Sequence, residues 1–169
     1  MRHCFVLAAI LALGLGLRAQ TLPGDADTTL LLRFDGNLLG VQGETPASAN
    51  ATGVAYVPGV FGQALQLTAG NQITFAAANN ISASAGTLEF WIKPNWAGTS
   101  TVSQYLLSWG TSGGLLFGKD ASPNWRALFN RTVAEQGVAV NANTFPANQW
   151  RHAAFTCEGT AIRIYLDGV

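Results

Sequence analysis

The chain has 169 residues, of which 49% are apolar and only 11% charged, and its formal net charge is zero. This length allows one domain with a sizeable core, and the charged fraction lies well below the roughly 25% of an ordinary globular protein. Lys and Arg form no cluster, so a nucleic-acid-binding protein is excluded as a reading. The composition favours an all-β exported protein.

Residues 1–19 have the pattern of a secretory signal peptide. Arg2 and His3 precede an apolar run at 5–17, whose 13 residues are fewer than the roughly 20 that span a bilayer. Ala19 is a suitable small residue before a cleavage site. We therefore predict a secreted or cell-surface protein with no membrane span in the mature chain; a buried core helix is the alternative reading of the run.

Short strands separated by turn residues are predicted beyond this segment. A polar linker at 20–27 leads into strands at 28–34, 54–57, 61–67 and 72–75, with a long loop expected over 38–53. The next strand, 86–94, alternates in character and carries Phe90 and Trp91 on opposite faces. Partial cover on both faces suits a central strand of a two-sheet protein.

The C-terminal part continues the same pattern of strands and turns. The strand expected at 115–118 pairs with the one at 125–129, and the last two strands form a hairpin. Asp167 and Gly168 then give a hairpin turn signal that expects a further strand, so we predict that the domain, 28–169, is truncated at its C-terminus. The strands predicted here cover 101–109, 115–118, 125–129, 137–141, 150–157 and 161–167.

Altogether about eleven short strands, 8–12 residues apart, argue for an all-β sandwich or barrel. After removal of residues 1–19, Cys157 is the one cysteine left. No intramolecular disulfide is then available, which favours a bacterial origin for an exported protein.

Five stretches, in this order, resemble the laminin G-like, concanavalin A-like jelly-roll family of secreted bacterial proteins: 30–36, 59–65, 86–94, 149–155 and 164–168. The resemblance implies a two-sheet antiparallel jelly-roll sandwich, with further domains beyond the chain. Many members bind calcium through carboxylates and backbone oxygens. Asp35, at the end of the first strand, is the candidate metal ligand; the alternative is that Asp35 caps its own turn. No cofactor other than calcium is suggested.

No catalytic residue is predicted. The family's hydrolases carry a Glu-x-Asp-x-x-Glu pattern, in which paired carboxylates about 5–5.5 Å apart perform retaining chemistry. Glu89 lies in the corresponding strand but has no second acid after it. A solvated or ion-paired carboxylate is the competing reading of Glu89. His152 is the one histidine of the mature chain, and no Gly-x-Ser-x-Gly elbow occurs.

Aromatic residues at loops are the candidate ligand contacts. Trp96 and Trp125 lie in or beside predicted loops, and Arg126 supplies a planar polar group next to Trp125. The competing reading makes both tryptophans core or loop plugs. We predict a secreted, non-catalytic binding or adhesion module for carbohydrate or an extracellular protein. The alternatives are a structural accessory domain without a ligand and a diverged glycan hydrolase or lyase.

Overall fold

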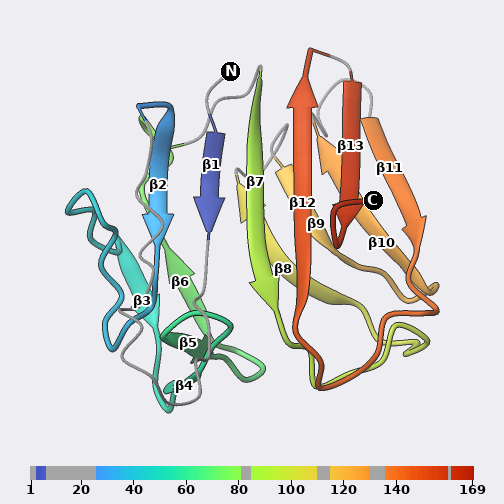
Figure 1. The fold of residues 1–169 in the computed structure, drawn as a ribbon, viewed down its shortest axis with the longest axis horizontal. Coiled ribbons are helices and arrows are strands. Elements are labelled where there is room, and N and C mark those ends of the chain that lie inside the picture. Colours follow the sequence, from blue (N-terminus) through green and yellow to red (C-terminus); the bar gives the residue numbers. More distant parts are fainter. Residues whose placement is uncertain (1–2, 7–25, 81–84, 110–114, 130–135, 160) are drawn as a thin grey trace, which may run out of the picture. The chain divides into compact units, whose positions relative to one another are not determined.

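A computed structural model describes residues 3–6, 26–80, 85–109, 115–129, 136–159 and 161–169. These residues form strands, turns and loops, with no helix among them, so the predicted all-β class is confirmed. The strands are β1 His3–Val6, β2 Thr28–Leu32, β3 Ser48–Asn50, β4 Ala55–Pro58, β5 Gln63–Gln66, β6 Gln72–Thr74, β7 Ala85–Ile92, β8 Gln104–Trp109, β9 Leu115–Lys119, β10 Asn124–Phe129, β11 Gln136–Asn141, β12 Arg151–Glu158 and β13 Ala161–Leu166 (Figure 1).

The strands belong to two compact units, each described by itself. The first comprises Met1–Ser82 and Leu88–Trp91, and the second comprises Ala83–Thr87 and Ile92–Val169. The residues of β7 are thus divided between the two units. Its side chains are partly covered on both faces, with Leu88 buried, as the positions of Phe90 and Trp91 on opposite faces of this strand predict.

In the first unit, β2 is the main apolar strand. Leu30, Leu31 and Leu32 are all buried, as expected for a strand covered on both faces. β1 pairs in parallel with β2, and β4 pairs antiparallel with β5. Because β1 lies within residues 1–19, it belongs to the segment predicted to be removed. That removal stays a prediction.

The long loop expected over 38–53 contains one strand that the sequence analysis missed. β3 pairs antiparallel with β6 through Ser48–Thr74, Ala49–Ile73 and Asn50–Gln72. All three residues of β3 are exposed, so the strand has no buried face and no apolar alternation to reveal it. Its ladder rests on backbone hydrogen bonds that a sequence pattern does not report.

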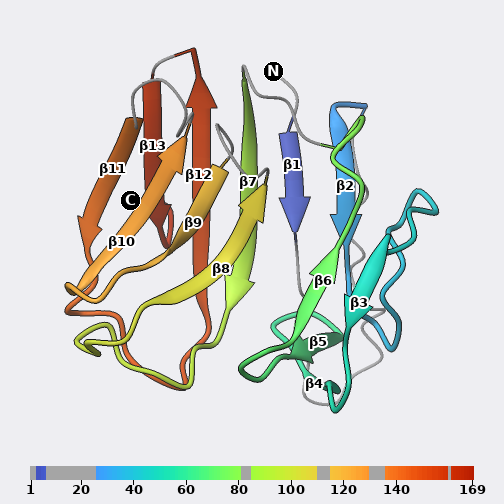
Figure 2. The same cartoon turned by 180° about the vertical axis from the view of Figure 1, so that it is seen from behind.

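The second unit contains a four-stranded antiparallel sheet, in the order β11-β10-β9-β8, and the β12–β13 hairpin. The predicted pairing of β9 with β10 and the predicted final hairpin are confirmed. β13 contacts β11 and β10, so the hairpin covers one face of the sheet. Figures 1 and 2 show the hairpin on one side and β9–β11 on the other.

The core of this unit lies between the two layers. Phe155, Cys157 and Ile164 face it from the hairpin, and the sheet contributes Phe117 and Trp125, both completely buried. Each such side chain contributes roughly 1.5–3 kcal/mol through removal of apolar surface from water.

The predicted turn signal at Asp167 and Gly168 is confirmed. Both residues have positive φ, 53° and 85°, and Leu166 and Val169 exchange two backbone hydrogen bonds across them. The Asp167 carboxylate accepts a hydrogen bond from the His152 backbone N–H (3.0 Å) and pairs with Arg151 (2.7 Å). Asp167 therefore links the end of β13 to the start of β12 and stabilises this end of the hairpin.

Candidate functional site

The two faces of the four-stranded sheet differ in what they present. Residues directly opposite one another on antiparallel strands share a face. One such row is Gln104, Lys119, Trp125 and Val140, which lies on the inner face. The next row is Tyr105, Gly118, Arg126 and Ala139, which lies on the outer face.

Trp125, a predicted ligand contact, lies on the inner face with no exposed surface. Its ring stacks on Phe117 at a centroid distance of 5.5 Å and meets Phe145 edge-on at 4.8 Å. Its Nε1 is buried without a hydrogen-bond partner among the described residues. Trp125 thus presents no ring face to a ligand, and the competing core reading describes its position.

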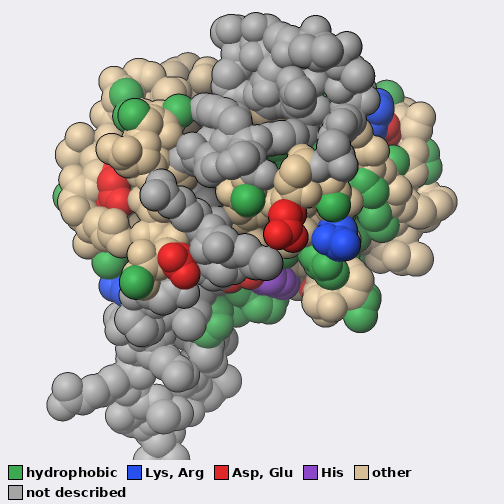
Figure 3. Space-filling model, turned by 90° about the horizontal axis from the view of Figure 1, so that it is seen from above, with side chains coloured by type: hydrophobic (Ala, Val, Ile, Leu, Met, Phe, Trp, Pro, Cys, Tyr) green, Lys and Arg blue, Asp and Glu red, His purple; other side chains and the backbone are tan. Residues whose placement is uncertain are grey.

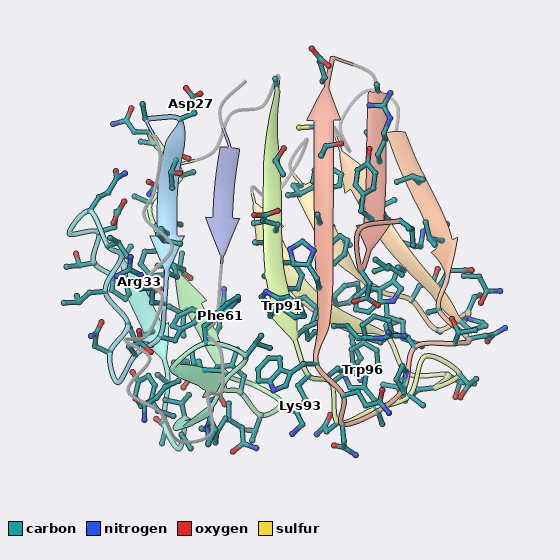
Figure 4. All side chains as sticks on the ribbon, in the orientation of Figure 1. Asp27, Arg33, Phe61, Trp91, Lys93 and Trp96 are labelled. Carbon is teal, nitrogen blue, oxygen red and sulfur yellow. The ribbon has the colours of Figure 1, made fainter. Side chains whose placement is uncertain are left out.

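Trp96, the second predicted aromatic contact, is half-buried in the loop that follows β7 (Figure 4). Its ring lies 5.6 Å from that of Trp125, tilted by 51°. Trp96 therefore extends the inner aromatic cluster toward solvent. Because it is not completely buried, Trp96 stays a candidate contact.

Arg126, the third predicted contact, is on the outer face. Its side chain is 42% exposed, and its Nε lies 3.7 Å from Oδ2 of Asp120, a side chain that is 25% exposed. Arg126 also has a further interaction within the protein. The structure therefore separates Arg126 from Trp125, its neighbour in sequence, by the thickness of the sheet.

The largest exposed aromatic side chain near Arg126 is one that the sequence analysis missed. Tyr105 on β8 is 69% exposed, and Leu106 beside it and Val102 just before the strand are also exposed. We call Val102, Tyr105 and Leu106 the β8 patch. β8 is at the edge of its sheet, so the patch borders solvent along one side of the strand.

A β-bulge explains why two successive residues of β8 are exposed. The register shifts between Tyr105 and Leu107, so Leu106 is an extra residue opposite β9. Gly118 allows this arrangement, because a Cβ there would lie 2.3 Å from the backbone oxygen of Gln104 and 3.0 Å from the Tyr105 Cα. A glycine inside a predicted strand was the one sequence signal that pointed to a bulge.

Asp35, the candidate metal ligand, lies in the first unit. Its Oδ1 accepts a hydrogen bond from the Gln63 backbone N–H at 2.9 Å, so the carboxylate joins the turn after β2 to the start of β5. No group of three or more His, Cys, Asp or Glu side chains suited to a metal occurs among the described residues. Calcium binding at Asp35 stays a prediction.

Glu89 and Cys157 are two further ionisable side chains. Glu89 is half-buried on β7 and has an interaction within the protein. Cys157 is buried on the inner face of β12, and this burial raises the pKa of its thiol, while a hydrogen bond with the Gly86 backbone lowers it by less. Cys157 is therefore kept as a thiol at neutral pH.

On the face drawn in Figure 3, the described acidic and basic side chains are interspersed, and some of opposite charge lie next to one another. In the first unit, Figure 4 shows Phe61 and Trp91, whose rings meet edge-on at 6.3 Å.

Within the described part of the chain, no helix is long and apolar enough to cross a membrane.

Comparison with known proteins gives one match. A family model described as the concanavalin A-like lectin/glucanases superfamily matches residues 67–169, which include the whole four-stranded sheet and the β12–β13 hairpin. Two of the five stretches behind the predicted resemblance, 30–36 and 59–65, lie outside the matched range. No curated protein and no solved structure matches significantly. Because the family match covers more than half of its residues, this chain belongs to the concanavalin A-like lectin/glucanases superfamily.

Proposed function

We propose that this chain is an exported, non-catalytic module that binds carbohydrate on the outer face of its four-stranded sheet. The observation that carries the proposal is the outer row, in which the strongly exposed Tyr105 is followed across the sheet by Gly118 and Arg126. Membership of a superfamily that includes lectins supports a binding role.

The chemistry of the row suits a sugar. A tyrosine ring offers a rigid apolar face and a hydroxyl, which together match the C–H face and the hydroxyl groups of a pyranose. Arg126 and Asp120 add a planar donor group and a carboxylate acceptor. Neighbouring strands lie about 4.8 Å apart, so the backbones of Tyr105 and Arg126 are separated by roughly 10 Å. Gly118 places no side chain between them.

A glycan array with the full chain tests this proposal. We expect one class of oligosaccharide to be retained, with Tyr105→Ala and Arg126→Met each weakening binding at least tenfold, about 1.4 kcal/mol. Leu67→Ala is the control, because Leu67 is an exposed apolar residue that belongs to the first unit and not to the sheet. Binding that survives both outer-face variants would place the ligand elsewhere, with Trp96 as the next candidate.

An extracellular protein is the second candidate ligand. Its support is that the β8 patch is apolar and lies on an edge strand, where an extended segment of another chain can add to the sheet. An array without any retained glycan, together with a surface protein whose capture depends on Val102 and Leu106, would favour this reading over a carbohydrate.

Two remaining readings have their own outcomes. A structural accessory domain predicts that neither glycan nor protein binding depends on the β8 patch. A diverged glycan hydrolase or lyase predicts activity on β-glucans that Glu89→Gln abolishes. The proposal of a non-catalytic module requires that no such activity be found.

A further inference from the structure

Lys119 is a fully buried lysine at the end of β9, and its side chain has no exposed surface. It lies on the inner face of the sheet, directly opposite Trp125 on β10 and Gln104 on β8. Burying an ammonium ion is costly unless its charge and its donors are satisfied. The hydrogen-bond partners of its Nζ therefore show how the buried charge is accommodated.

The recorded partners of the ammonium are all backbone carbonyl oxygens. Nζ donates to the oxygen of Ser100, to that of Asp120 at 2.8 Å and, more weakly, to that of Val102 at 3.5 Å. An ammonium has three protons to donate, so three carbonyls match its capacity. Ser100 and Val102 belong to the loop before β8, whereas Asp120 directly follows β9.

Three backbone oxygens that converge on one positive charge are the kind of environment that hard metal cations take in proteins. The carboxylate of Asp120 belongs to the same residue as one of these carbonyls, and its Oδ1 is buried without a hydrogen-bond partner among the described residues. The site thus has oxygen ligands and an adjacent acidic group, and the charge at its centre is supplied by a side chain of the protein.

We propose that Lys119 occupies a cation-binding site formed by the carbonyls of Ser100, Val102 and Asp120, as a cation tethered to the chain. It holds the loop that carries Val102 against the end of β9, without a metal ion. When the ammonium is withdrawn, the same oxygens would accept a free hard cation such as Ca²⁺. This inference does not depend on which ligand the outer face binds.

The first experiment needs only the unaltered full chain, because its sequence contains two lysines, Lys93 and Lys119. Lys93 is exposed and serves as the internal control. With ¹⁵N-labelled lysine, we expect a slowly exchanging ammonium signal from Lys119 and none from Lys93. Amine-directed methylation of the native protein should modify Lys93 at least about 100-fold faster, because a reagent reaches Lys119 only after opening of the structure. Equal reactivity of the two lysines would overturn the proposal.

The second experiment removes the tethered cation. Lys119→Met keeps a long apolar side chain but leaves three part-buried carbonyls without this donor, and we expect its Tm to fall by roughly 5–10 °C. Lys93→Met, the matched control, should melt with the unaltered chain. If Lys119→Met has the same Tm as the unaltered chain, the ammonium does not stabilise the loop against the end of β9.

The third experiment asks whether the site accepts a metal ion. Lys119→Ala opens the position, and calcium at about 10 mM should raise its Tm by roughly 5 °C over the same variant in chelator. The unaltered chain and Lys93→Ala should respond equally little to calcium. If Lys119→Ala gains no more than Lys93→Ala, the site is not a cation site. If Lys119→Ala is unfolded with and without calcium, that result also counts against a cation site.

Discussion

The inner and outer faces of the four-stranded sheet are made by alternate residues of the same strands. Trp125 is completely buried against Phe117 and Phe145, whereas Arg126, the next residue, is on the outer face in the row that contains Tyr105. On the inner face, aromatic rings contact one another and hold the two layers together. On the outer face, the aromatic ring of Tyr105 contacts solvent.

Residue type alone therefore does not decide between a core residue and a ligand contact. The side of the sheet decides it, and the side is set by register. A bulge in β8 then adds a second exposed residue, Leu106, where strict alternation would place one. Changes on the two faces should therefore have opposite signatures: inner changes alter stability, and outer changes alter binding.

The largest effect is expected on the inner face, at Trp125. Trp125→Ala removes the ring that contacts Trp96, Phe117 and Phe145, and should cost about 3–5 kcal/mol of unfolding free energy. The expected fall in Tm is roughly 10 °C or more, measured by circular dichroism. Trp96→Ala, at the half-exposed edge of the cluster, should cost less. A Trp125→Ala variant as stable as the unaltered chain would contradict the buried position.

A smaller loss of stability is expected at Gly118, where the backbones of β8 and β9 approach each other closely. Gly118→Ala places a Cβ 2.3 Å from the Gln104 backbone oxygen, so β8 must shift, at a cost of about 1–3 kcal/mol. Ligand binding at Tyr105 should weaken with it.

Gly137 on β11 offers the matched control for this change. A Cβ there meets the Leu128 Cδ2 at 2.7 Å, which is the end of a side chain and not backbone. Gly137→Ala should therefore cost less than Gly118→Ala in a urea titration and leave binding intact. Equal losses from the two alanines would show that the bulge of β8 plays no special part.

The free energy of unfolding should depend on pH through the buried thiol of Cys157 on β12. Because burial raises the pKa of Cys157 above its ordinary value of 9.0, the folded state holds the thiol proton more tightly than the unfolded state does. The stability from this group is therefore fully present below pH 9 and is lost as the pH rises through the raised pKa. Unfolding free energies from pH 7 to 11 should fall more steeply than in Cys157→Ala, in which other alkaline groups titrate unchanged. Parallel curves would show a thiol that ionises freely in the folded protein.

The smallest effect on stability is expected at Tyr105. Tyr105→Ala removes a ring that is mostly in solvent, so the free energy of unfolding should change by no more than about 0.5 kcal/mol. Binding to the selected glycan should nevertheless drop at least tenfold. A large loss of stability would show that Tyr105 helps to hold the fold, and would contradict the expectation that changes on the outer face alter binding and not stability.

Much of the fold could be predicted from local pattern. The strands from β7 to β13 were placed within a few residues, because each has apolar and β-branched residues bounded by turn residues. The Asp167–Gly168 turn could be predicted because its residue types tolerate positive φ. β3 could not, because all of its residues are exposed.

The candidate site was predicted only in part. The sequence identified Arg126 as a planar polar group near a strand, and the structure leaves it on the outer face. The sequence predicts Trp125 and Arg126 as neighbouring ligand contacts because they are adjacent along the chain. Alternation along a strand, however, places adjacent residues on opposite faces of the sheet. Tyr105 and the carbonyl partners of Lys119 were missed, because a bulge and the convergence of two segments leave no local pattern.

Local sequence pattern is enough to predict the all-β class, the order and approximate bounds of most strands, and Arg126 as a candidate contact. Which side chains contact solvent and which form the core depends on how the strands pair and pack. The physical reason is that strand propensity and turn chemistry are local, whereas the facing of a side chain depends on register with strands formed elsewhere in the chain. Lys119 shows the same division: the sequence contains the lysine, and the fold brings the three carbonyls around its charge.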